Sequence, residues 1–142
     1  MAPTLRVPEW VVPAEALVTD LYWHASNAVE QRGHPYTRGV LATLDWAAGD
    51  CPAPITHRSA QPVTDPIARA EEFAALCAQD DPNDPVPFPL EYAHVVDCGV
   101  SYAPIQYREP VYVRGVWWTV RWLRGERDID PPLPIPPRPP VV

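Results

Sequence analysis

The chain has 142 residues, with 11 basic and 18 acidic side chains and a formal net charge of −7. This charge argues against general binding to nucleic acid or to anionic membranes. No stretch approaches the roughly 18 consecutive apolar residues of a membrane-spanning helix. The length fits one domain, residues 1–142, whose core needs no disulfide or metal for its stability.

Three cysteines without a CxxC spacing, Cys51, Cys77 and Cys98, are typical of reduced thiols rather than of a disulfide framework. The first fifteen residues carry one basic side chain and several prolines, which makes a poor signal or transit peptide. We therefore expect a cytoplasmic protein. All the basic residues are arginine, and alanine and proline are abundant, as in a GC-rich bacterium or its phage.

The first part of the chain predicts two adjacent helices. Residues 2–12 are expected to be extended, with Trp10 available for packing. Apolar residues then keep a helical period from residue 14 to residue 32, and Gly33 ends the helix. A second helix begins at Pro35 and ends before Gly49. The short turn between them predicts that they lie side by side as a hairpin.

The middle of the chain is less regular. Residues 51–63 form a loop. Asp65 and Pro66 are typical of a helix start, so we expect a connector helix over residues 65–79. Prolines break the acidic segment 80–89. Residues 90–98 fit either a helix or a strand, and the short helix is favoured.

The last part predicts a helix over residues 110–124 and an extended polyproline II tail over residues 129–142, because proline fixes φ and removes backbone donors. Residues 36–49 recur at residues 112–125 with seven identities in fourteen. We interpret this as an internal duplication. Unit one spans about residues 10–55 and unit two about residues 86–130. The predicted fold is all-α: a duplicated pair of helical hairpins, a connector helix and extended proline-rich termini.

The repeated residues mark a packing stripe and a candidate ligand site. Gly39, Thr43 and Trp46 fall at i, i+4 and i+7, so they share one helix face, as do Gly115, Thr119 and Trp122. We expect the glycines to permit close backbone approach near a two-fold axis and the tryptophans to fill the flanking groove. The repeated pairs Tyr36 with Arg38 and Tyr112 with Arg114 form an alternative ligand pocket between the two hairpins, which would make the chain a small-ligand or metal-binding regulator or a small enzyme. A salt bridge from Arg38 to Glu30 is the structural alternative.

The last helix and the tail suggest a surface for a protein partner. Trp117 and Trp118 replace Leu41 and Ala42 of the first copy, and adjacent helix positions point about 100° apart. At least one tryptophan is therefore expected beneath the tail or at an interface, where tryptophan and arginine are enriched. The predicted partner surface comprises Trp117, Trp118, Arg121, Arg124, Pro134, Pro137 and Arg138. Docking of the tail on its own domain and docking on a partner both remain open.

Nucleic-acid binding is a third reading of the same helix. Arg114, Arg121, Arg124 and Arg127 flank the two tryptophans, and bases stack on aromatic rings beside arginines. The alternative is that these arginines pair with the acidic stretches at residues 71–72 and 80–81. The overall acidity makes nucleic acid the less favoured partner.

Enzyme and metal chemistry receive little support. The GxSxG, GxGxxG and GxxxxGK[ST] motifs do not occur, and we expect no catalytic residue, metal or cofactor. His94 and Cys98, at i and i+4, and Cys51 with His57 would be the residues to begin a zinc site. The leading prediction is a non-enzymatic interaction or assembly protein, with monomer or homo-oligomer left open.

Overall fold

The computed structural model describes residues 7–79 and 88–135, except for the side chains of Phe88 and Glu91. Predictions for residues 2–6, for residues 80–87 and for Pro137 and Arg138 lie outside this part. The described residues form five helices and no strand, which confirms the all-α prediction and the helical choice for residues 90–98. The helices are α1 (Glu15–Arg32), α2 (Pro35–Ala47), α3 (Asp65–Ala78), α4 (Phe88–Asp97) and α5 (Pro110–Leu123). None of them is long and apolar enough to cross a membrane.

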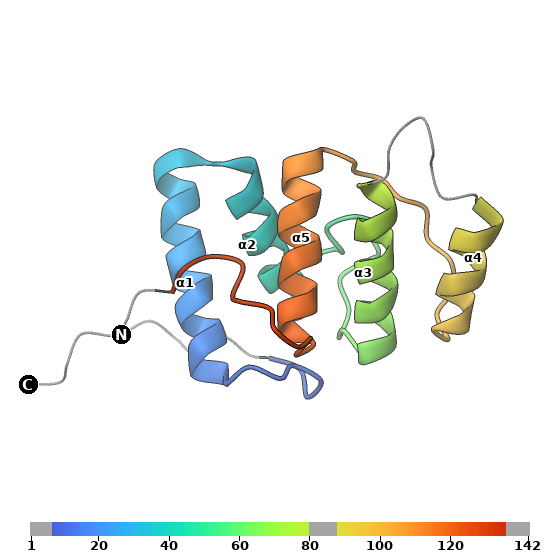
Figure 1. Ribbon diagram of the computed structural model, residues 1–142, viewed down its shortest axis with the longest axis horizontal. Coiled ribbons are helices and arrows are strands. Elements are labelled where there is room, and N and C mark those ends of the chain that lie inside the picture. The colour runs from blue at the N-terminus through green and yellow to red at the C-terminus, as the bar shows by residue number, and fades with distance from the viewer. Residues whose placement is uncertain (1–6, 80–87, 136–142) are drawn as a thin grey trace, which may run out of the picture.

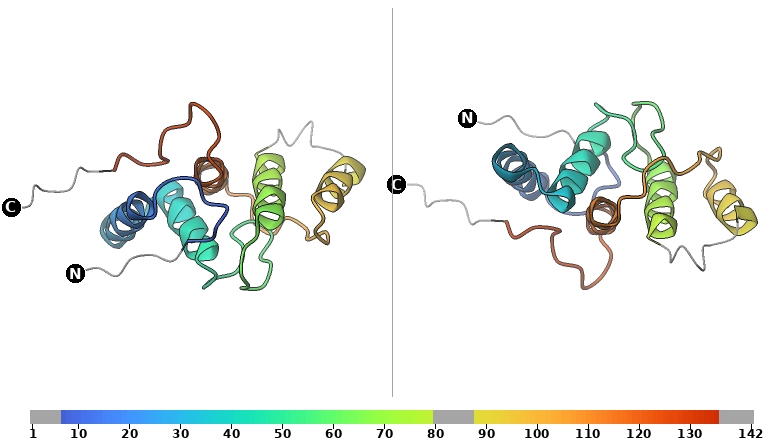
Figure 2. Two further views of the ribbon diagram at one scale, coloured as in Figure 1. Left: turned by 90° about the horizontal axis from the view of Figure 1, so that it is seen from below. Right: turned by 90° about the horizontal axis from the view of Figure 1, so that it is seen from above.

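The helices lie in the spatial order α1, α2, α5, α3, α4 (Figure 1). Helix α1 packs on α2, as the predicted first hairpin requires, and α2 packs on α5. The predicted second hairpin is wrong, because α4 packs on α3 and does not contact α5. The link between α4 and α5, residues 98–109, is long enough to let α3 lie beside α5 instead. Figure 2 shows the same order from two other directions.

Side chains at the helix starts fix where the helices begin. The Thr64 hydroxyl accepts a hydrogen bond from the Ile67 amide at 3.4 Å, so Thr64 caps α3 in place of the predicted Asp65. The Glu109 carboxylate caps α5 by accepting from the Tyr112 amide at 2.7 Å. At the C-terminal end of α1, Gly33 has a φ of 47° and its amide donates a hydrogen bond to the Val29 carbonyl, as predicted for a glycine that ends a helix.

Helices α2 and α5 touch backbone to backbone at two glycines. A Cβ atom on Gly39 would lie 2.2 Å from the Tyr112 carbonyl oxygen, and one on Gly115 would lie 2.3 Å from the Tyr36 carbonyl oxygen. Only glycine permits this approach. The contact is reciprocal, so the repeated glycines perform the packing role predicted for them.

The repeated tryptophans make a second reciprocal contact between the two halves. The side chain of Trp46, on α2, packs in the buried cluster formed with α3 and α5. The side chain of Trp122, on α5, packs in the buried cluster formed with α1 and α2. Both side chains are buried. Each half of the molecule is therefore completed by an aromatic ring from the other half, which ties the two clusters into one structure.

A buried carboxylate anchors the loop between α2 and α3. Glu71 accepts hydrogen bonds from the Ile55 amide at 2.7 Å, the Thr56 amide at 3.0 Å and the Thr56 hydroxyl at 2.7 Å. Burial raises the pKa of this carboxyl, and the three hydrogen bonds and nearby Arg58 partly offset the rise. The loop passes through His57 at a φ of 58°, a conformation that is uncommon for a residue other than glycine.

Candidate functional site

Two arginines of α5 are held by acidic side chains. Arg121 lies over the Trp117 ring, with its guanidinium carbon 4.1 Å from the ring centroid. Its Nε and Nη2 atoms both donate to the Glu126 carboxylate at 2.6 Å. This pairing lowers the pKa of Glu126 and raises that of Arg121. The arrangement fixes the Arg121 side chain along the edge of α5.

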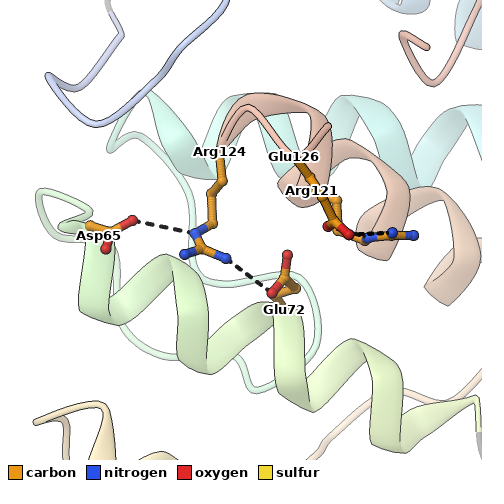
Figure 3. A network of polar contacts seen from close by, with 5 residues as sticks. All are labelled: Asp65, Glu72, Arg121, Arg124 and Glu126. Atoms are coloured by element: carbon orange, nitrogen blue, oxygen red, sulfur yellow. Dashed lines mark hydrogen bonds and ion pairs between the residues drawn. The ribbon is translucent and has the colours of Figure 1, made fainter. Parts of the chain in front are cut away.

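The second arginine, Arg124, joins α5 to α3. Its Nε lies 3.3 Å from Asp65 and its Nη1 lies 3.1 Å from Glu72 (Figure 3). The predicted pairing with Glu72 is therefore confirmed, whereas Glu71 is occupied with its loop. Burial raises the pKa of Glu72 although Arg124 opposes the rise. Phosphate binding by Arg121 or Arg124 would compete with these ion pairs for the donors of the guanidinium group.

A groove of about 420 Å³ is lined by residues of α3, α4 and α5. Its aromatic wall includes Trp117 of α5 and Phe73 of α3, and Phe73 stacks on His94 of α4 at a centroid distance of 3.7 Å. The remaining lining residues are Glu72, Leu76, Arg121 and Glu126. The predicted surface residues Trp117 and Arg121 thus form one side of a groove whose other side comes from α3 and α4.

Helix α4 exposes large apolar side chains next to this groove. Leu90, Tyr92 and Val96 are 63%, 48% and 45% exposed, and Leu76 on the neighbouring α3 is 44% exposed. Leu90 lies one turn before His94 and therefore on the groove side of α4. The sequence analysis missed this surface. Its signal was present, because apolar residues occur on every side of the predicted helix instead of along one stripe.

The tail is docked on its own body as far as residue 135. The Trp118 indole donates to the Asp130 carbonyl at 2.8 Å, and the Tyr36 hydroxyl donates to the Pro132 carbonyl at 2.9 Å. Trp118 therefore lies beneath the tail, as expected for one of the two tryptophans. The tail bends at residues 132–133, so a continuous polyproline II helix is wrong for this part. Pro134 is exposed.

The four residues of the alternative ligand pocket are divided between different surroundings. Tyr36 is bonded to the tail, and burial raises its pKa while nearby Arg114 opposes the rise. Tyr112 packs edge-on against Tyr107 at 4.6 Å, and burial raises its pKa to about 12. Among the described residues, Arg38 forms no ion pair with Glu30. Arg114 lies near Tyr36 and Arg38 lies near Tyr112, so each repeated tyrosine is close to the arginine of the other copy.

Tyr112 instead lines a depression of about 450 Å³ beside the loop anchored by Glu71. Asp45, Cys51 and His57 also line this depression. Burial raises the pKa of the Cys51 thiol, and Asp45 and Asp50 raise it further. This environment disfavours the thiolate that nucleophilic chemistry needs.

The candidate zinc ligands are not gathered into one set. Cys98 is buried and His94 stacks on Phe73. Across residues 7–79 and 88–135, no group of three or more His, Cys, Asp and Glu side chains is placed to hold a metal ion.

Comparison with known proteins adds no relative. No protein-family model matches the chain. No curated protein and no solved structure matches it significantly either. The function must therefore be argued from the geometry of the chain itself.

Proposed function

We propose that this chain is a non-enzymatic protein-interaction module, of the kind used in an assembly or a regulatory complex. Its partner surface, here called the α4 surface, comprises Leu76, Leu90, Tyr92 and Val96 together with the adjoining groove. The observation that carries the proposal is the exposure of these large apolar side chains on α4, which among the described helices contacts α3 alone. Exposed apolar patches mark interaction sites in soluble proteins. At about 100° per residue, Tyr92 and Val96 point well away from Leu90, so a partner would cover more than one side of α4.

The position of α4 at the edge of the molecule leaves part of its apolar surface uncovered. A helix normally buries an apolar stripe against the rest of its domain, and α4 does so through Val95, followed by the buried Cys98 just after its end. Leu90, Tyr92 and Val96 lie outside that stripe, so folding leaves each of them partly in water. Tyr92 also contacts Tyr102, at a ring-centroid distance of 5.5 Å. Covering apolar surface gains roughly 25 cal/mol per Å². A partner that covers the exposed sides of α4 therefore recovers stabilisation that the chain alone does not obtain.

The groove adds the features that give an interface its specificity. Tryptophan and arginine are enriched where binding energy concentrates, and Trp117 and Arg121 stand together in the groove wall. Because Glu126 holds Arg121 in place, little side-chain freedom is lost on binding. Arg124, which was also predicted for the partner surface, is paired with Asp65 and Glu72 of α3.

A second candidate function is binding of a small ligand in the depression beside Tyr112. The polar groups of Asp45, Cys51 and His57 on its wall favour this alternative. A melting-temperature rise of several degrees with one ligand class, abolished by Tyr112→Ala but not by Tyr107→Ala, would support it. Failure of every ligand class would leave the interaction proposal as the remaining candidate.

We also propose that the chain arose by internal duplication and works in the cytoplasm. The duplication is supported by the repeated sequence and by the reciprocal contacts of Gly39 and Gly115. The cytoplasmic location is supported by the three free cysteines, two of them buried.

The proposal is tested with Leu90→Asp and Val96→Asp variants of the full chain. Both side chains are exposed, so the variants should fold, which circular dichroism verifies. The matched control is Leu17→Asp on α1, whose side chain is 39% exposed at the far end of the molecule. Affinity capture should yield a protein with the parent chain and the control but not with the α4 variants. Once that protein is purified, its affinity should fall at least tenfold in the α4 variants. Unchanged binding by those variants would refute the proposed surface.

A further inference from the structure

At the opposite end of the molecule from α4, residues 129–135 cross their own body. We call this segment the strap. Figures 1 and 2 show it leaving the end of α5 and passing across to the side of α1. Ile129, Leu133 and Ile135 of the strap pack against the buried cluster that α1 and α2 form with Trp122. The strap therefore fills an apolar groove, and Pro132 is buried in it.

The groove binds the strap through hydrogen bonds to the carbonyl groups of the strap. Three of the seven strap residues are proline, so the strap offers few amide donors and recognition must come from its carbonyls and apolar side chains. Trp118 and Tyr36 each direct one aromatic donor at the strap, to the carbonyls of Asp130 and Pro132, two residues apart. Aromatic grooves that bind proline-rich peptides use the same combination of ring surface and donor.

The connection between α5 and the strap behaves as a hinge by its geometry. Residues 125–128 are exposed. Gly125 has a φ of 76° and Asp128 a φ of 61°, and the latter is uncommon for a residue with a side chain. Within this turn Glu126 is bonded back to Arg121. The turn is thus fixed to α5 independently of the strap, so the strap can leave its groove without loss of the α5 terminus.

We infer that the groove is a binding site for an extended proline-rich peptide, and that the strap of a second copy of this chain can replace the molecule's own strap in it. A second copy supplies the same carbonyls and the same apolar side chains, so every contact is reproduced. Exchange of an identical segment between copies is a low-cost route to association. This inference does not depend on the α4 surface, which lies on other helices.

The inference is tested on the full chain carrying a protease site between Arg127 and Asp128. After cleavage the released segment competes with a fluorescent peptide of the strap sequence, IDPPLPI, and anisotropy reports binding. We expect saturable binding to the cleaved chain and at least tenfold weaker binding to the uncleaved one. Trp118→Phe and Tyr36→Phe should each weaken binding severalfold, while Tyr107→Phe, at an exposed tyrosine outside the groove, should not.

Two further outcomes keep the inference open to refutation. A cleaved chain that stays folded but binds no peptide overturns it, and so does a cleaved chain that unfolds, because the strap is then an inseparable part of the fold. For the intact chain, sedimentation should show a dimer whose population increases with protein concentration. The Leu133→Asp variant should form no such dimer. Peptide binding without such a dimer would retain the groove and reject the second copy as its occupant.

Discussion

The substitution Gly39→Ala probes the contact on which the whole arrangement depends. The added methyl group would lie 2.2 Å from the Tyr112 carbonyl oxygen, and ordinary contact begins at 3.4 Å. The two helices would therefore have to separate by about 1.2 Å, the difference between these distances. Both partners at the contact are backbone, so no side-chain rotation relieves the clash. Separation would also loosen Trp46 and Trp122, which cross between the halves.

The expected magnitude follows from two opposing terms. Overpacking a core costs about 1–3 kcal/mol, and a backbone clash belongs at the upper end. Replacing glycine inside a helix returns up to about 1 kcal/mol through helix propensity. We therefore expect a net loss of about 2 kcal/mol in the free energy of unfolding, measured by urea denaturation.

The reciprocal substitution and a control complete the experiment. Gly115→Ala should cost a similar amount, because its methyl group would lie 2.3 Å from the Tyr36 carbonyl. Ala42→Gly, on α2 with Gly39, removes a methyl group away from the crossing of the two helices and should cost only about 1 kcal/mol. A Gly39→Ala protein as stable as the parent would show that the two backbones do not touch, and the packing argument would fail.

Further predictions concern the buried Glu71, the thiol of Cys51 and the ion pairs of Arg124. Glu71→Leu should cost about 3 kcal/mol or more in urea denaturation, because three buried donors lose their acceptor. Glu71→Gln keeps an acceptor and should also remove a pH dependence. Since the folded-state pKa of Glu71 is raised from 4.5, the parent's stability falls as pH rises from that value through the raised pKa; an unchanged profile in Glu71→Gln would contradict this. Cys51, with its raised pKa, should react with iodoacetamide at pH 7.5 more slowly in the folded than in the unfolded chain, and equal rates by mass spectrometry would be the contrary result. Arg124→Ala should cost about 1 kcal/mol through its partly exposed ion pairs, against no measurable loss in the exposed control Arg127→Ala.

Local sequence signals predicted most of the helices because the determinants are local. Gly33 ends α1 through its own backbone conformation, and the glycine at residue 39 predicts a close approach wherever its helix packs. The recurrence of the same residues at 112–125 also identified α5 as the partner. These features need no knowledge of the rest of the chain.

Features set by distant parts of the chain could not be predicted in this way. The choice of α3 rather than α4 as the neighbour of α5 depends on how the apolar faces fit, and both helices carry such faces. Glu71 appeared to be one of two surface acids, and only the position of the loop at residues 55–56 explains its burial. The exposure of Leu90 and Val96 follows from the same displacement of α4 to the edge of the molecule.

The proposed function is tested most directly by site-specific photo-crosslinking in cells. A photoreactive amino acid is placed at Val96 on the α4 surface or, in a matched chain, at Leu17 on α1, both partly exposed. Illumination should link the chain with Val96 replaced to a discrete protein partner, and should give no such adduct from the chain with Leu17 replaced. An absence of adducts at residue 96, or identical adducts from both positions, would contradict an interaction surface on α4.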